Sequence, residues 1–212
     1  MKSKYFSEFL GTAFLFCTVV GSGIMGENLS SNDSLTLLAN TLATVFALYF
    51  LISIFGDHSS HFNPLVSMVM LVRKEISPQV CTVFIILQIS GAILGVMLAN
   101  YIFEYDPVYF SEKPRSGTHL FVSEILATFG LLMVILLSAK EKVAVTVAAY
   151  IGAAYWFTSS TSFANPAVTF GRIFSDSFAG ISPYDFPMFV LMQFVGCLAG
   201  LGIYKIMFPQ QD

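Results

Sequence analysis

The chain has 212 residues, of which 56% are hydrophobic and 11% charged, and its formal net charge is −3. Soluble domains carry about 25% charged residues, so this composition indicates an integral membrane protein, and the slightly negative charge argues against a nucleic-acid partner. The three cysteines lie far apart in apolar segments, which predicts buried thiols and neither a disulfide framework nor a metal site. We expect no cofactor.

Six segments are long and apolar enough to cross a bilayer, which takes about 20 residues. In chain order, the spans are predicted at residues 5–25, 35–55, 79–101, 119–139, 143–161 and 184–208. Two further apolar stretches, 63–72 and 165–174, are too short to span. Because one short stretch follows the second span and the other follows the fifth, the pattern predicts one domain over residues 1–212. It is built from repeats at about 1–110 and 111–212.

Both halves carry the same polar residues in the same order. Glu8 in the first span matches Glu124 in the fourth, each four residues before a threonine, and Gln88 in the third span matches Gln193 in the sixth. Three spans per half is an odd number, so the second half must lie inverted in the membrane. A carboxylate in an apolar span usually faces the bundle interior with a partner. The symmetric placement favours structural support over a proton relay.

Each short stretch opens with an Asn-Pro box: Asn63-Pro64-Leu65 in the first half and Asn165-Pro166-Ala167 in the second. Asn followed by Pro is typical of a helix N-cap. Two such starts at membrane depth direct the positive ends of two helix dipoles at one point, which would repel cations. Each Asn is either only a cap or also a donor to a permeating molecule, and the matched pair favours the second interpretation.

The loops before the boxes are predicted to offer backbone carbonyls to the pore, because non-helical backbone at this depth must be buried or line water. They comprise Ser59, Ser60 and His61 in the first half and Thr161, Ser162 and Phe163 in the second. Asp57 and His58 extend the first loop into a Ser-His-Asp cluster. No distant third ligand accompanies this cluster, so a catalytic zinc or hydrolase site is disfavoured.

The basic residues predict the orientation. If both termini are cytoplasmic, only Lys113, Arg115 and Arg172 of the ten basic residues fall outside. This distribution satisfies the positive-inside rule, so we predict a multi-pass protein of the cell membrane with both termini cytoplasmic.

Over nearly its whole length the chain resembles the aquaporin and glycerol-facilitator family. The resemblance implies an all-α membrane protein with six transmembrane helices and two re-entrant half-helices in an inverted 3+3 repeat. It also implies a homotetramer in the lipid bilayer with one pore per subunit, Glu8 and Glu124 bracing the re-entrant loops, and passive transport rather than catalysis. Residues 161–180 are similar to a bacterial subgroup associated with arsenic resistance.

The chain departs from the family pattern at the narrowest point of the pore, the selectivity filter. The family usually has Arg directly after the second Asn-Pro-Ala, where this chain has Val168. Counting along the chain from the boxes, the resemblance implies a small and mostly apolar filter of Ala43, Ala153, Ser162 and Val168. We therefore predict a wide channel for water and small neutral solutes, such as glycerol, urea or metalloid hydroxides including arsenite. The alternatives are a water-selective aquaporin or a poorly conducting structural membrane protein of the same fold.

Two residues near the boxes leave alternatives open. Arg172 lies four positions after Val168, where it either places a positive charge at the outer mouth or is solvated or paired with Asp176. The sequence slightly favours the second interpretation. Leu65 replaces the usual Ala, and it either narrows the centre of the pore or packs against its neighbours.

Overall fold

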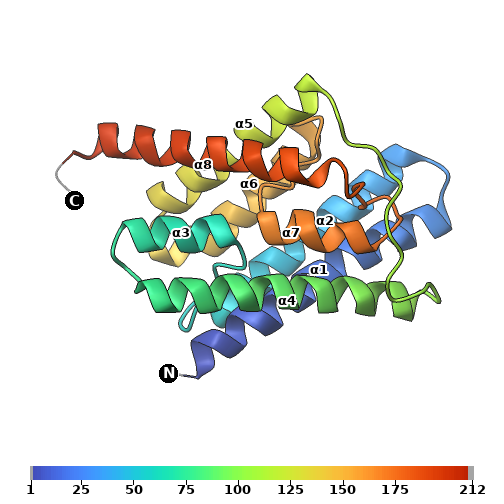
Figure 1. Ribbon diagram of the computed structural model, residues 1–212, viewed down its shortest axis with the longest axis horizontal. Helices are drawn as coiled ribbons and strands as arrows, with labels where there is room; N and C mark the ends of the chain where they lie inside the picture. The colour runs from blue at the N-terminus through green and yellow to red at the C-terminus, as the bar shows by residue number, and fades with distance from the viewer. Residues whose placement is uncertain (1, 210–212) are drawn as a thin grey trace.

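The computed structural model describes residues 2–209, and every regular element in that range is helical (Figure 1). The long helices are α1 (Ser3–Leu29), α2 (Asp33–Phe55), α4 (Pro78–Ile102), α5 (Thr118–Leu137), α6 (Val143–Phe157) and α8 (Phe186–Met207). The short ones are α3 (Pro64–Val72) and α7 (Pro166–Gly171), with 3-10 turns η1 (Lys140–Lys142) and η2 (Arg172–Phe174). The predicted order of six long and two short helices is confirmed.

α6 is shorter than the other long helices. Within residues 2–209, α1, α2, α4, α5 and α8 have the length and composition needed to cross a membrane. The 15 residues of α6 rise only about 22 Å, less than the ~30 Å hydrocarbon core. Thr158 adopts an extended conformation and its hydroxyl donates to the Ala154 carbonyl at 2.6 Å, so the helix stops before the end of the predicted span at 161. The chain then enters the loop that carries Asn165.

The helix packing follows the inverted repeat. α1 packs against α4 in the first half as α5 packs against α8 in the second, and α2 packs against α6 between them. Glycines let these helices approach closely: a Cβ on Gly91 or Gly95 of α4 would collide with the backbone of α1, and one on Gly196 of α8 would collide with the Ile125 carbonyl of α5. These glycines allow backbone contact, as small residues do between membrane helices.

The two half-helices lie end to end between α4 and α8, with their N-termini facing each other (Figure 1). α3 and α7 contact each other, and each of them contacts both α4 and α8. The ends of the described chain lie at the same end of the bundle, and the connection over residues 103–117 crosses the opposite end (Figure 1). This arrangement brings both Asn-Pro boxes to the middle of the bundle.

Candidate functional site

Each asparagine caps its half-helix, as the sequence predicts. The Asn63 side-chain oxygen accepts a hydrogen bond from the Leu65 N–H at 2.9 Å, and the Asn165 oxygen accepts from the N–H groups of Ala167 and Val168 at 3.0 and 3.3 Å. In both helices Pro occupies the first turn, where its missing N–H costs nothing. The Asn side chains therefore satisfy backbone donors that would otherwise be unpaired at the start of each helix.

The two boxes are also joined to each other. The side-chain nitrogen of Asn63 donates to the Ala164 carbonyl at 2.9 Å, and that of Asn165 donates to the Phe62 carbonyl at 2.7 Å. An amide nitrogen has two N–H groups, so each asparagine keeps one donor after making this bond. Both asparagines line the cavity described below.

The loop residues before the boxes adopt an unusual backbone conformation. Phe62 and Ala164, each directly before its asparagine, both have φ of 49°, and Thr161 and Ser162 have φ of 62° and 53°. The left-handed region costs a non-glycine residue about 1–2 kcal/mol. Such a conformation persists only where neighbouring bonds hold it.

Two buried carboxylates supply those bonds. Glu124 is fully buried and accepts from the N–H groups of Phe163 and Ala164, both at 3.0 Å, and from the Gln193 side-chain nitrogen at 2.6 Å. Gln193 also donates to the Thr169 hydroxyl of α7 at 2.8 Å. The second loop is thereby fixed to α5 through one carboxylate.

Glu8 holds the first loop in the matching way. It accepts from the N–H groups of His61 and Phe62 at 2.7 and 2.8 Å, from the Ser59 hydroxyl, and from the Gln88 side-chain nitrogen at 2.8 Å. These are the contacts that the expected supporting role requires of Glu8 and Glu124.

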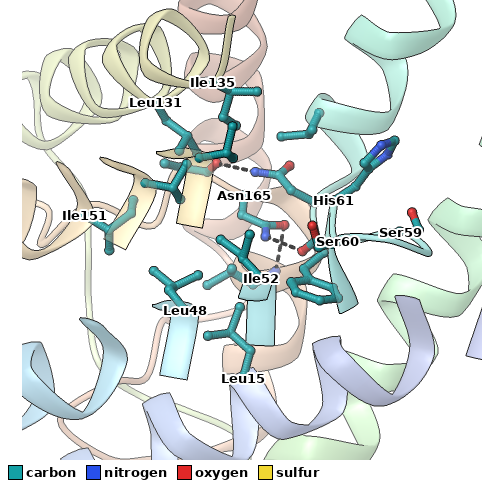
Figure 2. Close-up of a pocket in the computed structure, with 18 of the residues that line it drawn as sticks. Leu15, Leu48, Ile52, Ser59, Ser60, His61, Leu131, Ile135, Ile151 and Asn165 are labelled. Carbon is teal, nitrogen blue, oxygen red and sulfur yellow. Dashed lines mark hydrogen bonds between the residues drawn. The ribbon is translucent and has the colours of Figure 1, made fainter. Parts of the chain in front are cut away.

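A cavity of about 750 Å³ passes both asparagines. Figure 2 shows apolar side chains of four helices on one side of it and the polar loop residues with Asn165 on the other. The labelled apolar residues are Leu15 of α1, Leu48 and Ile52 of α2, Leu131 and Ile135 of α5, and Ile151 of α6. The labelled polar residues are Ser59, Ser60, His61 and Asn165.

The lining residues recur at the same distances from the two asparagines. In each half the three residues before Asn, and the third and seventh residues after it, line the cavity. These pairs are Ser60 and Ser162, His61 and Phe163, Phe62 and Ala164, Val66 and Val168, and Met70 and Arg172. The helical members share one face because positions three and seven lie on one stripe of a helix. Thr161, Pro64, Pro166 and Ala167 do not belong to the lining.

Leu65 is fully buried and outside the cavity lining, so it packs in the protein interior and leaves the pore centre open. Of the four expected filter residues, Ser162 and Val168 line the cavity, whereas Ala43 and Ala153 do not, and Ala153 is exposed on the outer surface of the bundle. For these two positions the structure corrects the prediction.

The correction is one of helix register. α2 lines the cavity with every fourth residue, namely Thr44, Leu48 and Ile52, and α6 does the same with Val143, Val147, Ile151 and Tyr155. Each residue turns the helix by about 100°, so an offset of one or two positions moves a side chain to another face. Thr44 and Tyr155 replace Ala43 and Ala153, and their hydroxyls lie 3.1 Å apart. This period of four is visible only in the structure, because the apolar residues of both helices are spread around the helix and give no periodic signal in the sequence.

Arg172 also differs from the favoured expectation. It is only 2% exposed, lines the cavity, and makes no bond to Asp176. Asp176 instead accepts from the Glu112 N–H at 3.0 Å and the Ser111 hydroxyl at 3.4 Å. α7 ends at Gly171 and tightens into η2, so Asp176 does not lie one helical turn beyond Arg172.

The other two outer basic residues converge on the same region. Arg115 is 8% exposed and donates to three backbone carbonyls, those of Ser160, Phe178 and Gly180. The Lys113 ammonium donates to the Phe178 carbonyl at 2.9 Å. Burial, aided by the nearby Arg115 charge, lowers the pKa of Lys113 to about 8.

Two re-entrant half-helices that meet beside a cavity, within an inverted repeat of apolar helices, define a membrane channel. Residues 1–157 match the family described as Major intrinsic protein, to which the chain belongs. It is 43% identical over 203 residues to Aquaglyceroporin AqpS of Rhizobium meliloti (strain 1021), covering 94% of this chain and 87% of that protein.

A solved structure shares the fold. The X-ray structure of the aquaglyceroporin from Plasmodium falciparum matches with a TM-score of 0.70 at 20% identity, covering 100% of this chain and 98% of that one. These matches confirm the predicted fold class and the predicted family. Members of this family are channels and not enzymes.

Proposed function

We propose that the protein is a passive channel for water and small neutral solutes such as glycerol, urea and metalloid hydroxides including arsenite. The cavity with one apolar and one polar side is the observation that carries this proposal. A polyol can place its carbon chain against Leu48, Ile52 and Ile151 while its hydroxyls bond to the Asn63 and Asn165 amides. The names of the relative from Rhizobium meliloti and of the solved structure, both aquaglyceroporins, support glycerol as a permeant.

The filter in this proposal consists of Thr44, Tyr155, Ser162 and Val168. Thr44 takes the place of the bulky aromatic residue found in water channels of the family, and Val168 takes the place of the usual Arg. Val168 removes a charged donor from what would otherwise be a tight ring, and this favours solutes larger than water. Tyr155 acts in the opposite direction, because it is larger than the alanine expected there and its hydroxyl lies 3.1 Å from that of Thr44. Ser60, His61 and Phe163 contribute the loop surface next to the asparagines.

The assembly and orientation are also proposals. The chain would form a homotetramer in the cell membrane, with both termini cytoplasmic. The ends of the described chain lie at one end of the bundle, and the connection over residues 103–117, which contains Lys113 and Arg115, lies at the other (Figure 1). With the termini inside, most basic residues are cytoplasmic, which supports this orientation.

Stopped-flow swelling of proteoliposomes tests the function. We expect faster flux of water, glycerol and urea than in protein-free vesicles. The Ile151→Trp variant, which adds bulk on the apolar wall and leaves the polar side intact, should abolish all three fluxes. Water flux without glycerol or urea flux would favour the water-selective alternative. An absence of all flux from correctly folded protein would favour the structural one.

A further inference from the structure

We propose that Arg172, together with Ser162, forms a polar constriction on the outer side of the boxes, where Arg172 both donates hydrogen bonds to the passing solute and excludes cations. This inference rests on the proposed channel function. It assigns these tasks to a residue one helical turn beyond Val168, the position where the family usually has its arginine.

Two contacts fix the Arg172 side chain. Its Nε donates to the Ala179 carbonyl, and its guanidinium carbon lies 3.5 Å from the centre of the Phe163 ring. Phe163 is itself held, because its N–H bonds to Glu124 and its ring packs edge-on against Phe189 at 5.2 Å. A guanidinium stacked on a fixed aromatic ring has few alternative positions.

The rest of the guanidinium is available to the cavity. An arginine has five N–H donors, of which Nε carries one. No acceptor in residues 2–209 pairs with the terminal nitrogens of Arg172, although the residue is 2% exposed and lines the cavity. These donors lack a protein partner, so a solute or water oxygen in the cavity is the acceptor that they can find.

Ser162 presents a second group in the same condition. Its hydroxyl is buried and has no hydrogen-bond partner among the described residues, and Ser162 lines the same cavity. A buried hydroxyl without a partner is costly. A permeating hydroxyl could accept from Arg172 and pair with Ser162.

The charge of Arg172 is not neutralised by a carboxylate. The ion pair observed among residues 2–209 does not involve Arg172. It joins Arg73 to Glu75 at 2.6 Å, at the other end of the cavity. The partners of the outer basic groups are instead carbonyls, mostly of residues 178–180. A positive charge in a low-dielectric constriction raises the energy of an approaching cation and imposes no such charge repulsion on a neutral solute.

The repeat explains why Arg172 reaches the pore. It lies seven residues after Asn165, and Met70, seven residues after Asn63, lines the opposite part of the same cavity. The backbone therefore places position 172 on the pore-facing stripe in any case. At this matched pair of positions, the second half alone carries a charge.

Three substitutions separate the two tasks. Arg172→Met removes donors and charge, Arg172→Gln keeps amide donors but removes the charge, and Arg172→Lys keeps the charge. Proteoliposomes loaded with a pH-sensitive dye report proton leak under a potassium-valinomycin gradient, and swelling reports glycerol flux. Lys142→Met is the matched control because it removes one basic charge at an exposed position outside the cavity lining.

We expect proton leak to rise on the order of tenfold or more in Arg172→Met and Arg172→Gln. It should stay at the wild-type level in Arg172→Lys and in the control Lys142→Met. Glycerol flux should fall about 3- to 10-fold in Arg172→Met, the equivalent of one lost hydrogen bond, and less in Arg172→Gln. Thermal unfolding and size-exclusion profiles check folding, and Arg172→Gln replaces Arg172→Met if the latter does not fold.

Unchanged proton leak and unchanged glycerol flux in folded Arg172→Met or Arg172→Gln would overturn the proposal. Its failure is distinguishable from failure of the channel function. A wild-type protein without solute flux rejects the channel, whereas a conducting wild type with indifferent Arg172 variants rejects only the constriction.

Discussion

Removing the Glu124 carboxylate should release the loop that carries the second box. Glu124 is fully buried and is the hydrogen-bond acceptor for the Phe163 and Ala164 N–H groups. Ala164 has φ of 49° and holds the Asn63 amide through its carbonyl. Without the carboxylate, the bond from Asn63 is left to hold Ala164 in this strained backbone conformation. The link between the boxes should then break.

The size of the effect follows from these contacts. In Glu124→Ala, two backbone N–H groups and one N–H of the Gln193 amide lose their acceptor, at a cost of about 1–3 kcal/mol each. The variant also no longer bears the cost of burying a charged carboxylate, which offsets part of this loss. We therefore expect a net decrease of about 2–4 kcal/mol in the free energy of unfolding. Glu124→Gln restores one acceptor oxygen and should recover about half of the loss.

Unfolding by SDS in mixed micelles measures the stability, and proteoliposome swelling measures glycerol flux. We expect the glycerol flux of Glu124→Ala to be at least tenfold below wild type. The displaced loop would raise the free-energy barrier to permeation by about 1.4 kcal/mol or more. Glu141→Ala, at an exposed glutamate in η1, is the control for losing one carboxylate. Wild-type stability and flux in Glu124→Ala would refute the supporting role of this residue.

Three further predictions concern packing, pore width and pH. Gly196→Ala should destabilise the protein by about 1–3 kcal/mol, because the added Cβ meets the Ile125 backbone. The control Gly202→Ala, whose Cβ has open space, should leave the stability unchanged. Equal unfolding curves for the two variants would contradict the packing argument. Val168→Arg should reduce glycerol flux at least tenfold while retaining water flux, since one charged side chain fills the filter. Swelling assays in glycerol and in sucrose measure the glycerol flux and the water flux separately. Unchanged glycerol flux would show that Val168 is not part of the filter. The pKa of Lys113 is lowered to about 8, against ~10.4 in the unfolded chain, so the unfolded chain binds more protons between these pH values and the free energy of unfolding should rise with pH in that window. Melting curves recorded across this range should show the rise as a growing difference in stability between wild type and Lys113→Met. A difference that does not change with pH would disprove the argument.

The centre of the site could be predicted from the sequence because it depends on local rules. Asn followed by Pro determines where each half-helix begins, and the observed starts at Pro64 and Pro166 agree. The matched order of Glu, Asn-Pro and Gln in the two halves predicted the inverted repeat. Glu8 and Glu124 could be paired with the loops because a buried carboxylate needs donors nearby.

The wall of the pore could not be predicted with the same accuracy, because it depends on helix rotation. Counting back from the boxes selected Ala43, whereas Thr44 faces the cavity. In α6 the distance is also altered by the loop, because the helix stops at Phe157 and the following residues enter the membrane as non-helical backbone. A spacing taken from relatives cannot register such a change.

The outer end of the pore was hardest to predict because there the two halves differ. At equal distance from the asparagines, the first half places Met70 and the second places Arg172. The favoured pairing of Arg172 with Asp176 assumed a continuing helix, but η2 and a loop replace it. The symmetric residues tie the two boxes together and hold them, so they are constrained to match. A difference between the halves is free to set which solutes pass, so selectivity should reside mainly where the repeat is broken, at Arg172.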